Sequence, residues 1–251
     1  VPYCPESILS GIEKTYKKGT AFYYKREFSL PNGFIKDKVI LHFGAVDQIA
    51  EVYLNGKLLG SHIGGYEAFS FDITNELKEN NELLVIATDD LDKTYPYGKQ
   101  KRNRGGMWYT TVSGIWQTVW VESVASEYIK SLKIEPDLKG ATVTVDGIDE
   151  AKIVITTPEG EKEIEMVGGA FRFAPENPRL WSPKDPYLYN FKIITPYDTV
   201  TSYFALRTIS VGFSGGVTRL MLNEKPYFFH GLLDQGYFPD GIFTPASPEL
   251  F

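Results

Sequence analysis

Hydrophobic and polar positions alternate along this chain in short runs with a period of two. Residues 39–43 (VILHF) are apolar on both faces, and residues 46–54 run into Asn55-Gly56. Asn-Gly between apolar runs is the strongest short signal for a β-hairpin, because both central residues of a type I′ turn need positive φ. Residues 66–73 predict another strand, and nothing in this stretch has the 3.6-residue period of a helix. The pattern predicts an antiparallel sheet that a second sheet must cover.

The flanking residues continue this pattern. Residues 1–18 hold two prolines and little periodicity, and we expect them to cover one sheet edge as an extended lead-in. Further strands are predicted at residues 21–30, 82–88 and 113–122. In the last of these, the spacing of Trp116 and Trp120 would also suit a helix face, whereas the β-branched flank and the even spacing suit a strand with both rings on one face.

Residues 89–112 form a long irregular segment between two predicted strands. A loop of this length inside a compact domain is more often functional or disordered than neutral. Its Lys99, Lys101, Arg102 and Arg104 put four cations within six residues. Two interpretations stay open: a solvated turn, or a mobile arm that reaches a carboxylate or a hydroxyl-rich ligand.

A second domain is predicted to begin near Val124. Seven short strand-like runs follow, separated by turn residues at the spacing expected of an immunoglobulin-like sandwich. Residues 177–189 (NPRLWSPKDPYLY) form a proline-rich crossing between its sheets. The runs are residues 128–136, 141–145, 152–156, 162–167, 170–174, 189–195 and 199–204.

Composition excludes several classes of function. A net charge of −6 argues against nucleic acid or an anionic membrane as the main partner, and no apolar run approaches a membrane span. The single Cys4 excludes an internal disulfide, and three dispersed histidines disfavour a structural metal site. No glycine pair has phosphate-loop spacing, so we predict no cofactor. The chain begins VPYCPES without a signal-like segment, which is compatible with a removed targeting peptide; cytoplasmic and periplasmic locations both stay open.

Two segments of the first domain carry a family resemblance. AVDQIAEVYLNGKLLGSHIGGYEAFSFDIT (residues 45–74) and SGIWQTVWVE (residues 113–122) resemble the N-terminal sugar-binding jelly roll of family 2 glycoside hydrolases, which include β-galactosidases, β-glucuronidases and β-mannosidases. NPRLWSPKDPYLY and YFALRTISV resemble the second, immunoglobulin-like domain of that family.

The end of the chain resembles the family's entry into a (β/α)₈ barrel. The stretch is LMLNEKPYFFHGLLDQGYFPDG, residues 220–241. The resemblance implies a hairpin at residues 222–226, a first barrel strand at residues 227–233, and then a first helix capped by Ser247. The expected fold is therefore all-β, with a jelly-roll sandwich at residues 1–123, an immunoglobulin-like sandwich at 124–211, and a stub of a truncated barrel at 212–251.

The resemblance implies the front part of a retaining β-glycosidase. Such enzymes need two carboxyl groups roughly 5 to 5.5 Å apart. In the family both are glutamates on later barrel strands, so we expect no catalytic residue in this chain and no hydrolysis by it. The Asn223-Glu224 pair resembles the family's acid/base motif, but it lies in the hairpin before the barrel, and we reject it.

Candidate substrate-binding residues lie in the loop and near the end of the chain. In the family, this loop reaches the barrel mouth, and galactosidases and glucuronidases carry an acidic sugar ligand five residues before the SGIW motif. Here that position is Trp108, which can stack on a sugar but cannot accept hydroxyl hydrogen bonds; this argues against galactoside or glucuronide specificity. Asp234 would end the first barrel strand, where a ligand contact and a barrel-rim salt bridge both stay open. The candidates are Lys99, Gln100, Trp108, Tyr109, Asp234 and Gln235.

Two other functions remain as alternatives. An autonomous carbohydrate-binding module would need exposed aromatic rings on a sandwich face or at loop tips, and it would bind oligosaccharide alone. A purely structural adhesion protein would fit two sandwiches but not residues 220–251. The leading hypothesis implies a β-glycoside substrate and the catalytic barrel as partners; a homo-oligomer stays open.

Overall fold

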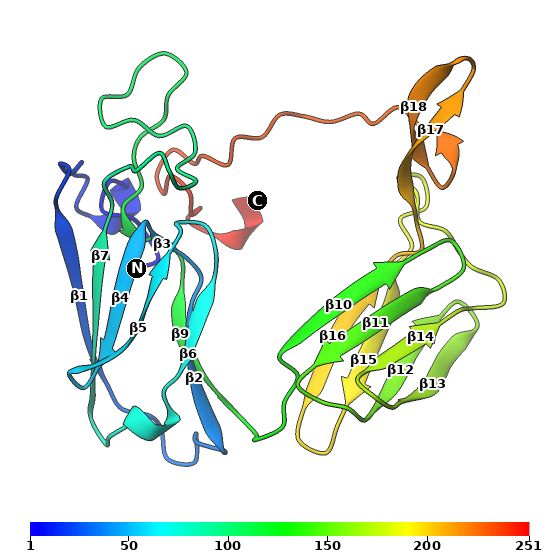
Figure 1. The fold of residues 1–251 in the computed structure, drawn as a ribbon, viewed down its shortest axis with the longest axis horizontal. Coiled ribbons are helices and arrows are strands. Elements are labelled where there is room, and N and C mark those ends of the chain that lie inside the picture. The colour runs from blue at the N-terminus through cyan, green and yellow to red at the C-terminus, as the bar shows by residue number, and fades with distance from the viewer. Residues whose placement is uncertain (251) are drawn as a thin grey trace. The chain divides into compact units, whose positions relative to one another are not determined.

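The computed structural model describes residues 1–250. It is built from antiparallel sheets (Figure 1), and its helices are three short 3₁₀ turns within the described residues. None of these turns has the length or the apolar character of a membrane-spanning helix. The chain folds as two compact units, Val1–Val124 with Asp234–Phe251, and Ala125–Leu233.

The first unit is a sandwich of two antiparallel sheets. Its core includes Val39, Leu41 and Phe43, which are 0–2% exposed. One sheet has the order β1 (Ala21–Phe28), β7 (Asn81–Thr88), β4 (Ile49–Leu54) and β5 (Lys57–Ile63). The other has the order β6 (Phe69–Asp72), β2 (Lys38–Phe43) and β9 (Val119–Val124), and the short strands β3 (Val46–Asp47) and β8 (Gly114–Ile115) pair beside them.

The predicted hairpin at Asn55-Gly56 is confirmed. Both residues have positive φ, 53° and 81°, and they join β4 to β5. The Asn55 side chain also donates to the Glu76 carbonyl at 2.7 Å and accepts from the Glu82 amide at 2.9 Å. The turn is therefore tied to two other segments of the sandwich.

The prediction of one strand over residues 113–122 is wrong. Strand β8 ends at Ile115 and β9 begins only at Val119. The two tryptophans separate because Trp116 is 8% exposed and donates from Nε1 to the Gly65 carbonyl at 2.8 Å, whereas Trp120 is 43% exposed. A buried indole N–H needs a hydrogen-bond acceptor, and the irregular residues 116–118 allow Trp116 to reach one.

The second unit is an immunoglobulin-like sandwich, and its seven predicted strands are confirmed. Tyr189 and Phe204 stack in its core with ring centroids 5.3 Å apart. One sheet has the order β13 (Gly160–Met166), β12 (Ala151–Thr157), β15 (Tyr189–Ile194) and β16 (Thr199–Phe204), and the other has the order β10 (Ser131–Pro136), β11 (Ala141–Asp146) and β14 (Ala170–Phe173).

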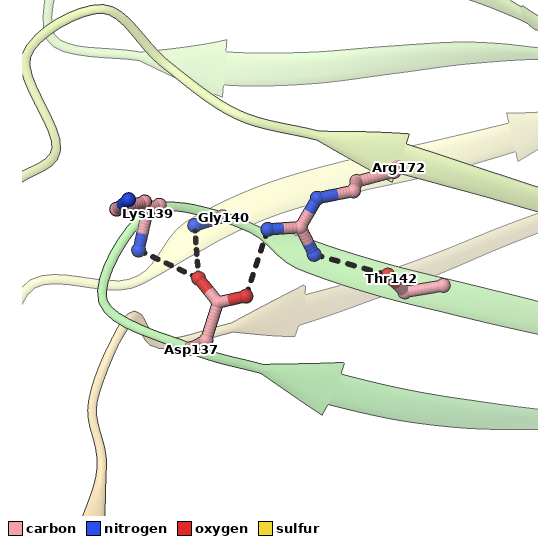
Figure 2. A network of polar contacts seen from close by, with 5 residues as sticks. All are labelled: Asp137, Lys139, Gly140, Thr142 and Arg172. Carbon is pink, nitrogen blue, oxygen red and sulfur yellow. Dashed lines mark hydrogen bonds and ion pairs between the residues drawn. The ribbon is translucent and has the colours of Figure 1, made fainter.

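An ionic network closes the β10–β11 turn (Figure 2). The Asp137 carboxylate accepts from the amides of Lys139 and Gly140 at 2.6 and 2.8 Å and from Arg172 at 2.7 Å, and Arg172 also donates to Thr142. The Arg172 hydrogen bond and these two amides lower the pKa of Asp137 to about 2. The turn therefore keeps its charged carboxylate at any ordinary pH.

The structure of residues 209–233 contradicts part of the barrel prediction. Strands β17 (Ile209–Ser214), β18 (Val217–Leu222) and β19 (Lys225–Pro226) form an antiparallel sheet, which includes the expected hairpin at residues 222–226. Residues 227–233 form no strand, and no barrel stub is present in the described chain. A parallel barrel strand is held by neighbours on both sides, and no strand pairs with residues 227–233 among the described residues.

The last described residues return to the first unit. The Leu9 amide, within η1 (Ile8–Ser10), donates to the Asp240 carbonyl at 3.1 Å, and the Thr244 hydroxyl donates to the Trp116 carbonyl at 2.6 Å. Ser247 precedes the 3₁₀ turn η3 (Pro248–Leu250), the third such turn after η1 and η2 (Thr74–Glu76). This segment thereby becomes part of the sandwich end that carries the long loop.

Candidate functional site

The candidate site is the loop of residues 89–112, which leaves β7 and returns at β8 (Figure 1, green). Asp89 begins it: its Oδ1 accepts from the Leu91 amide at 2.7 Å and turns the chain out of the sheet. The loop has no helix or paired strand of its own, apart from one isolated bridge between Gln100 and Tyr109. Side chains must therefore hold its shape.

Arg102 anchors the loop to the rest of the first unit. Its guanidinium donates to three backbone carbonyls, those of Asp89 at 2.9 Å, Tyr16 at 3.2 Å and Asp90 at 3.3 Å. A planar guanidinium suits such convergent acceptors better than an ammonium group does. Of the four clustered cations, this one ties the loop to the N-terminal lead-in; Lys99, Lys101 and Arg104 are exposed.

Gln100 is buried beneath the loop and has a structural role. It is 2% exposed; its Nε2 donates to the Tyr66 hydroxyl at 3.1 Å and lies 3.4 Å from Asp47 Oδ2, and its Oε1 accepts from the Val112 amide at 2.7 Å. Every polar atom of the side chain is thus used within the fold. No sequence signal indicates this burial, because a glutamine beside three cations in a loop has the composition of a solvated turn.

Tyr109 and Trp108 differ in what they offer to a ligand. The half-buried Tyr109 ring lies against Tyr237, with centroids 3.8 Å apart, and its amide donates to the Lys99 carbonyl at 2.8 Å. Trp108 is 36% exposed, with the Lys101 ammonium 6.0 Å from its ring centre. The indole is therefore the aromatic surface of the loop that a sugar could reach.

The two candidate residues near the C-terminus are Asp234 and Gln235. Asp234 is exposed, and its Oδ1 accepts from the Gly236 amide at 2.8 Å in a local turn; Gln235 is half-buried. Tyr237 comes two residues later and stacks on Tyr109 of the loop. All six candidate residues consequently belong to the first unit, although the sequence separates them into two distant groups.

Three carboxyl groups, two of them buried and one half-buried, lie at the base of the loop, and sequence reasoning missed them. Glu6, Asp47 and Asp89 come from three distant segments. The Ser113 hydroxyl lies 2.7 Å from Glu6 Oε1 and 3.2 Å from Asp89 Oδ2, and the Ser113 amide donates to Glu6 at 3.2 Å. Asp47 accepts from Gln100 in the same cluster.

Burial sets the ionisation of these carboxyl groups. Loss of hydration, together with the charges of Asp89 and Glu6, raises the pKa of Asp47 to about 7 against the opposing hydrogen bond from Gln100. Burial likewise raises the pKa of Glu6 and of Asp89, although hydrogen bonds to both groups and, at Asp89, the Arg102 charge oppose it. The cluster is most stable with some of its protons in place.

This cluster does not have the surroundings of a hydrolytic pair. Asp47 and Asp89 are 1% and 3% exposed, so a sugar cannot lie between them. The larger grooves described in the chain, of 460 to 850 Å³, are lined by other residues. The described residues also contain no group of three or more acidic, histidine or cysteine side chains placed to hold a metal ion. We assign the three carboxyl groups to the support of the loop.

Two family models match the chain. Residues 9–121 match the family described as "Glycosyl hydrolase 2 galactose-binding domain-like", and residues 124–207 match "Glycosyl hydrolases family 2". The two matches follow one another in the order of the two sandwiches. The chain belongs to family 2 of the glycoside hydrolases.

Curated relatives of this family 2 chain are considerably longer than it is. It is 26% identical to a β-galactosidase of Thermoanaerobacter pseudethanolicus over 86% of its own residues and 32% of that protein. It is 24% identical to a β-glucuronidase of Paenibacillus borealis, over 83% of its residues and 39% of that protein. The chain thus spans about a third of the length of these relatives.

Solved structures of family 2 enzymes share the fold. A β-glucuronidase from Ruminococcus gnavus in complex with N1-substituted uronic isofagomine aligns with a TM-score of 0.71 and 27% identity, over 97% of this family 2 chain and 46% of that chain. A β-glucuronidase of Bacteroides uniformis aligns with a TM-score of 0.65 and 25% identity, over 92% and 31% of the two chains. The family 2 chain corresponds to the N-terminal, non-catalytic domains of such enzymes.

Proposed function

We propose that this chain is the N-terminal portion of a retaining β-glycosidase. In this proposal it positions and helps to shape the sugar site of a catalytic (β/α)₈ barrel whose two glutamates lie outside residues 1–251. The domain order is a jelly roll at residues 1–123, an immunoglobulin-like spacer at 124–211, and a connection towards the barrel at 212–251. The support is the match of both sandwiches to family 2 and the greater length of the relatives.

The part of the proposal that concerns the sugar site rests on one contact. The Tyr109–Tyr237 stack joins the loop to the end of residues 220–241, the stretch that resembles the family's entry into the barrel. The loop carries exposed Trp108 and Lys99, and the segment that it joins carries exposed Asp234. An exposed indole beside the Lys101 ammonium is a suitable rim for a sugar, because the ring stacks and the charged group binds hydroxyls.

Hydrolysis assays test whether the catalytic residues lie outside residues 1–251. The chain of residues 1–251 is expected to release no nitrophenol from nitrophenyl β-galactoside, β-glucuronide or β-mannoside, whereas the longer protein that contains it hydrolyses one of them. Turnover by residues 1–251 that Glu224→Gln abolishes would overturn the proposal.

Trp108 tests the role of the loop in the longer protein. Trp108→Ala is expected to raise KM by up to about tenfold, because a lost stacking contact corresponds to roughly 0.5–1.5 kcal/mol. Trp108→Phe should retain most of the affinity, and Met107→Ala, at an exposed neighbouring position, should leave KM unchanged. Equal effects of the Trp108 and Met107 variants would contradict a stacking role.

One observation favours a second function, that of an autonomous carbohydrate-binding module. An autonomous carbohydrate-binding module needs an exposed ring on a sandwich face, and Trp120 is 43% exposed on β9. Retention of residues 1–251 by a polysaccharide, without the longer protein, would support this alternative.

A further inference from the structure

A groove of about 850 Å³ opens between the two sheets of the first unit. Strand β1 lines it from one sheet and β9 from the other. Both are edge strands, since among the described residues β1 pairs only with β7 and β9 only with β2. The β6-β2-β9 sheet has three strands, whereas the sheet that it faces has four. A jelly roll divides eight strands between two sheets, and one more strand beside β9 would make these two sheets equal.

The walls of this groove are core side chains that the sandwich covers only in part. Val119 and Val121 of β9 face the core, because they lie opposite core residues of β2. Tyr24 of β1 faces it as well, since it lies opposite buried Val85. All three residues are half-buried, and so are three others in the groove: Phe28, Leu30 and Phe34. A further layer of apolar side chains would therefore remove more apolar surface from water.

The backbone of β9 presents unpaired hydrogen-bonding groups along the groove. The Gly44 amide donates to the Thr118 carbonyl at 2.9 Å. Because alternate residues of an antiparallel strand bond to the same neighbour, the N–H and C=O groups of Val119 and Val121 point away from β2. These groups have no partner among residues 1–250. An apolar small molecule in the groove would leave them unpaired, whereas an added β-strand bonds to them.

Arg26 adds an unpaired charge to the groove. It lies opposite Leu83, which is 8% exposed, so its side chain leaves β1 on the face that lines the groove. Its neighbour Lys25 is on the opposite face and binds Glu82 at 2.6 Å. Arg26 has no ion pair or hydrogen bond within the described part of the chain. An inward-pointing charge hinders unspecific pairing at an edge strand, and a strand that does enter must bring a carboxylate for the guanidinium.

We propose that the groove accepts an additional β-strand, supplied by residues that precede Val1 in the longer protein. Val1 itself lines the groove, so a strand joined to its amino group needs no long connection. The added strand pairs with the outer edge of β9, places apolar side chains at alternate positions over the half-covered core, and sets a carboxylate against Arg26. This inference rests on the longer protein of the proposed function, although not on its activity.

A zero-length cross-link tests the carboxylate. In the longer protein, Arg26→Lys keeps the positive charge and provides an amine that a carbodiimide joins to an adjacent carboxylate. Mass spectrometry of the digested product should show position 26 coupled to an aspartate or glutamate that precedes Val1. Coupling of Lys25 to Glu82 is the internal control, because the two already form an ion pair. Coupling of position 26 to any other part of the chain or to a second copy, or the control product alone, would overturn the inference.

Hydrogen exchange tests the pairing with β9. In the longer protein, the Val119 and Val121 amides should exchange at least a hundredfold more slowly than in a form cut immediately before Val1. The Trp120 amide, which points to β2, is the matched control, and its protection in both forms shows an intact sheet. Equal exchange of the Val121 amide in the two forms, or a longer protein with no residue before Val1, would overturn the inference. Neither experiment measures hydrolysis, so either result leaves the test of the proposed function independent.

Discussion

The phenol rings of Tyr109 and Tyr237 lie parallel, with their centroids 3.8 Å apart and their planes 11° apart. One ring belongs to the loop of residues 89–112, and the other to the segment after residue 233. Tyr237 also packs edge-on against Phe243, with centroids 4.9 Å apart. This stack joins two parts of the chain that the sequence places far apart.

Tyr237→Ala should loosen both segments. An aromatic pair contributes about 0.5–1.5 kcal/mol beyond the area it buries, so we expect a loss of about 1–3 kcal/mol in the free energy of unfolding of the first unit. Urea denaturation followed by tryptophan fluorescence measures this loss. Limited trypsin digestion should also cut faster after Lys99 and Lys101.

Tyr237→Phe is the matched control, since it keeps the stacked ring and removes only the hydroxyl. It should behave like the wild type in both measurements. A Phe variant as unstable as the Ala variant would show that the hydroxyl, rather than the stack, holds these segments together.

The stability of the first unit should fall as the pH rises from about 4 to 8. Asp47 has its pKa raised to about 7, so the folded state holds a proton that the unfolded chain releases near its ordinary value. The contribution of protonated Asp47 to the free energy of unfolding is complete below pH 4 and is lost as the pH rises through 7. The rise in the pKa of Asp47, from 3.8 to about 7, corresponds to on the order of 4 kcal/mol in the free energy of unfolding.

Asp47→Asn removes this titration and should flatten the dependence. The variant should be more stable than the wild type at pH 8, as measured by urea midpoints from pH 4 to 8. Asp137→Asn in the second unit is the control, because the pKa of Asp137, about 2, lies below this range. A steep dependence that persists in Asp47→Asn would assign the titration to Glu6 and Asp89, whose pKa values burial also raises.

Gly114→Ala should destabilise the first unit strongly. Gly114 has φ +70°, and a Cβ there would overlap the Tyr24 hydroxyl, which accepts from the Ile115 amide at 3.3 Å. The left-handed backbone costs about 1–2 kcal/mol with a side chain, and overpacking adds about 1–3 kcal/mol. The expected total is about 2–5 kcal/mol, measured by thermal or urea unfolding.

Gly33→Ala isolates the backbone part of this cost. Gly33 has φ +78° but open space around its Cβ position, so we expect only about 1–2 kcal/mol. Adding Tyr24→Phe to Gly114→Ala should recover part of the loss by removing the obstructing hydroxyl. Equal costs at the two glycines would show that the Tyr24 contact does not matter.

The candidate site was only partly predictable. Trp108 and Lys99 are exposed in the structure, which is compatible with the ligand contact expected of them. The burial of Gln100 could not be predicted, because its partners, Tyr66 and Asp47, come from other strands and turns. A loop of polar residues has no periodicity that reports which side chains point inward.

Local rules by themselves determined many, but not all, of the strands and turns of this protein. Period-two alternation fixed the seven strands of the second unit, and positive φ at Asn55-Gly56 fixed a hairpin, since both depend on neighbouring residues alone. The tertiary structure alone decided the placement of Trp116, the joining of Glu6 to Asp89 through Ser113, and the stacking of Tyr237 on the loop. These contacts link segments distant in the sequence, and they form because a buried indole N–H and buried carboxyl groups need hydrogen-bond partners wherever the fold supplies them.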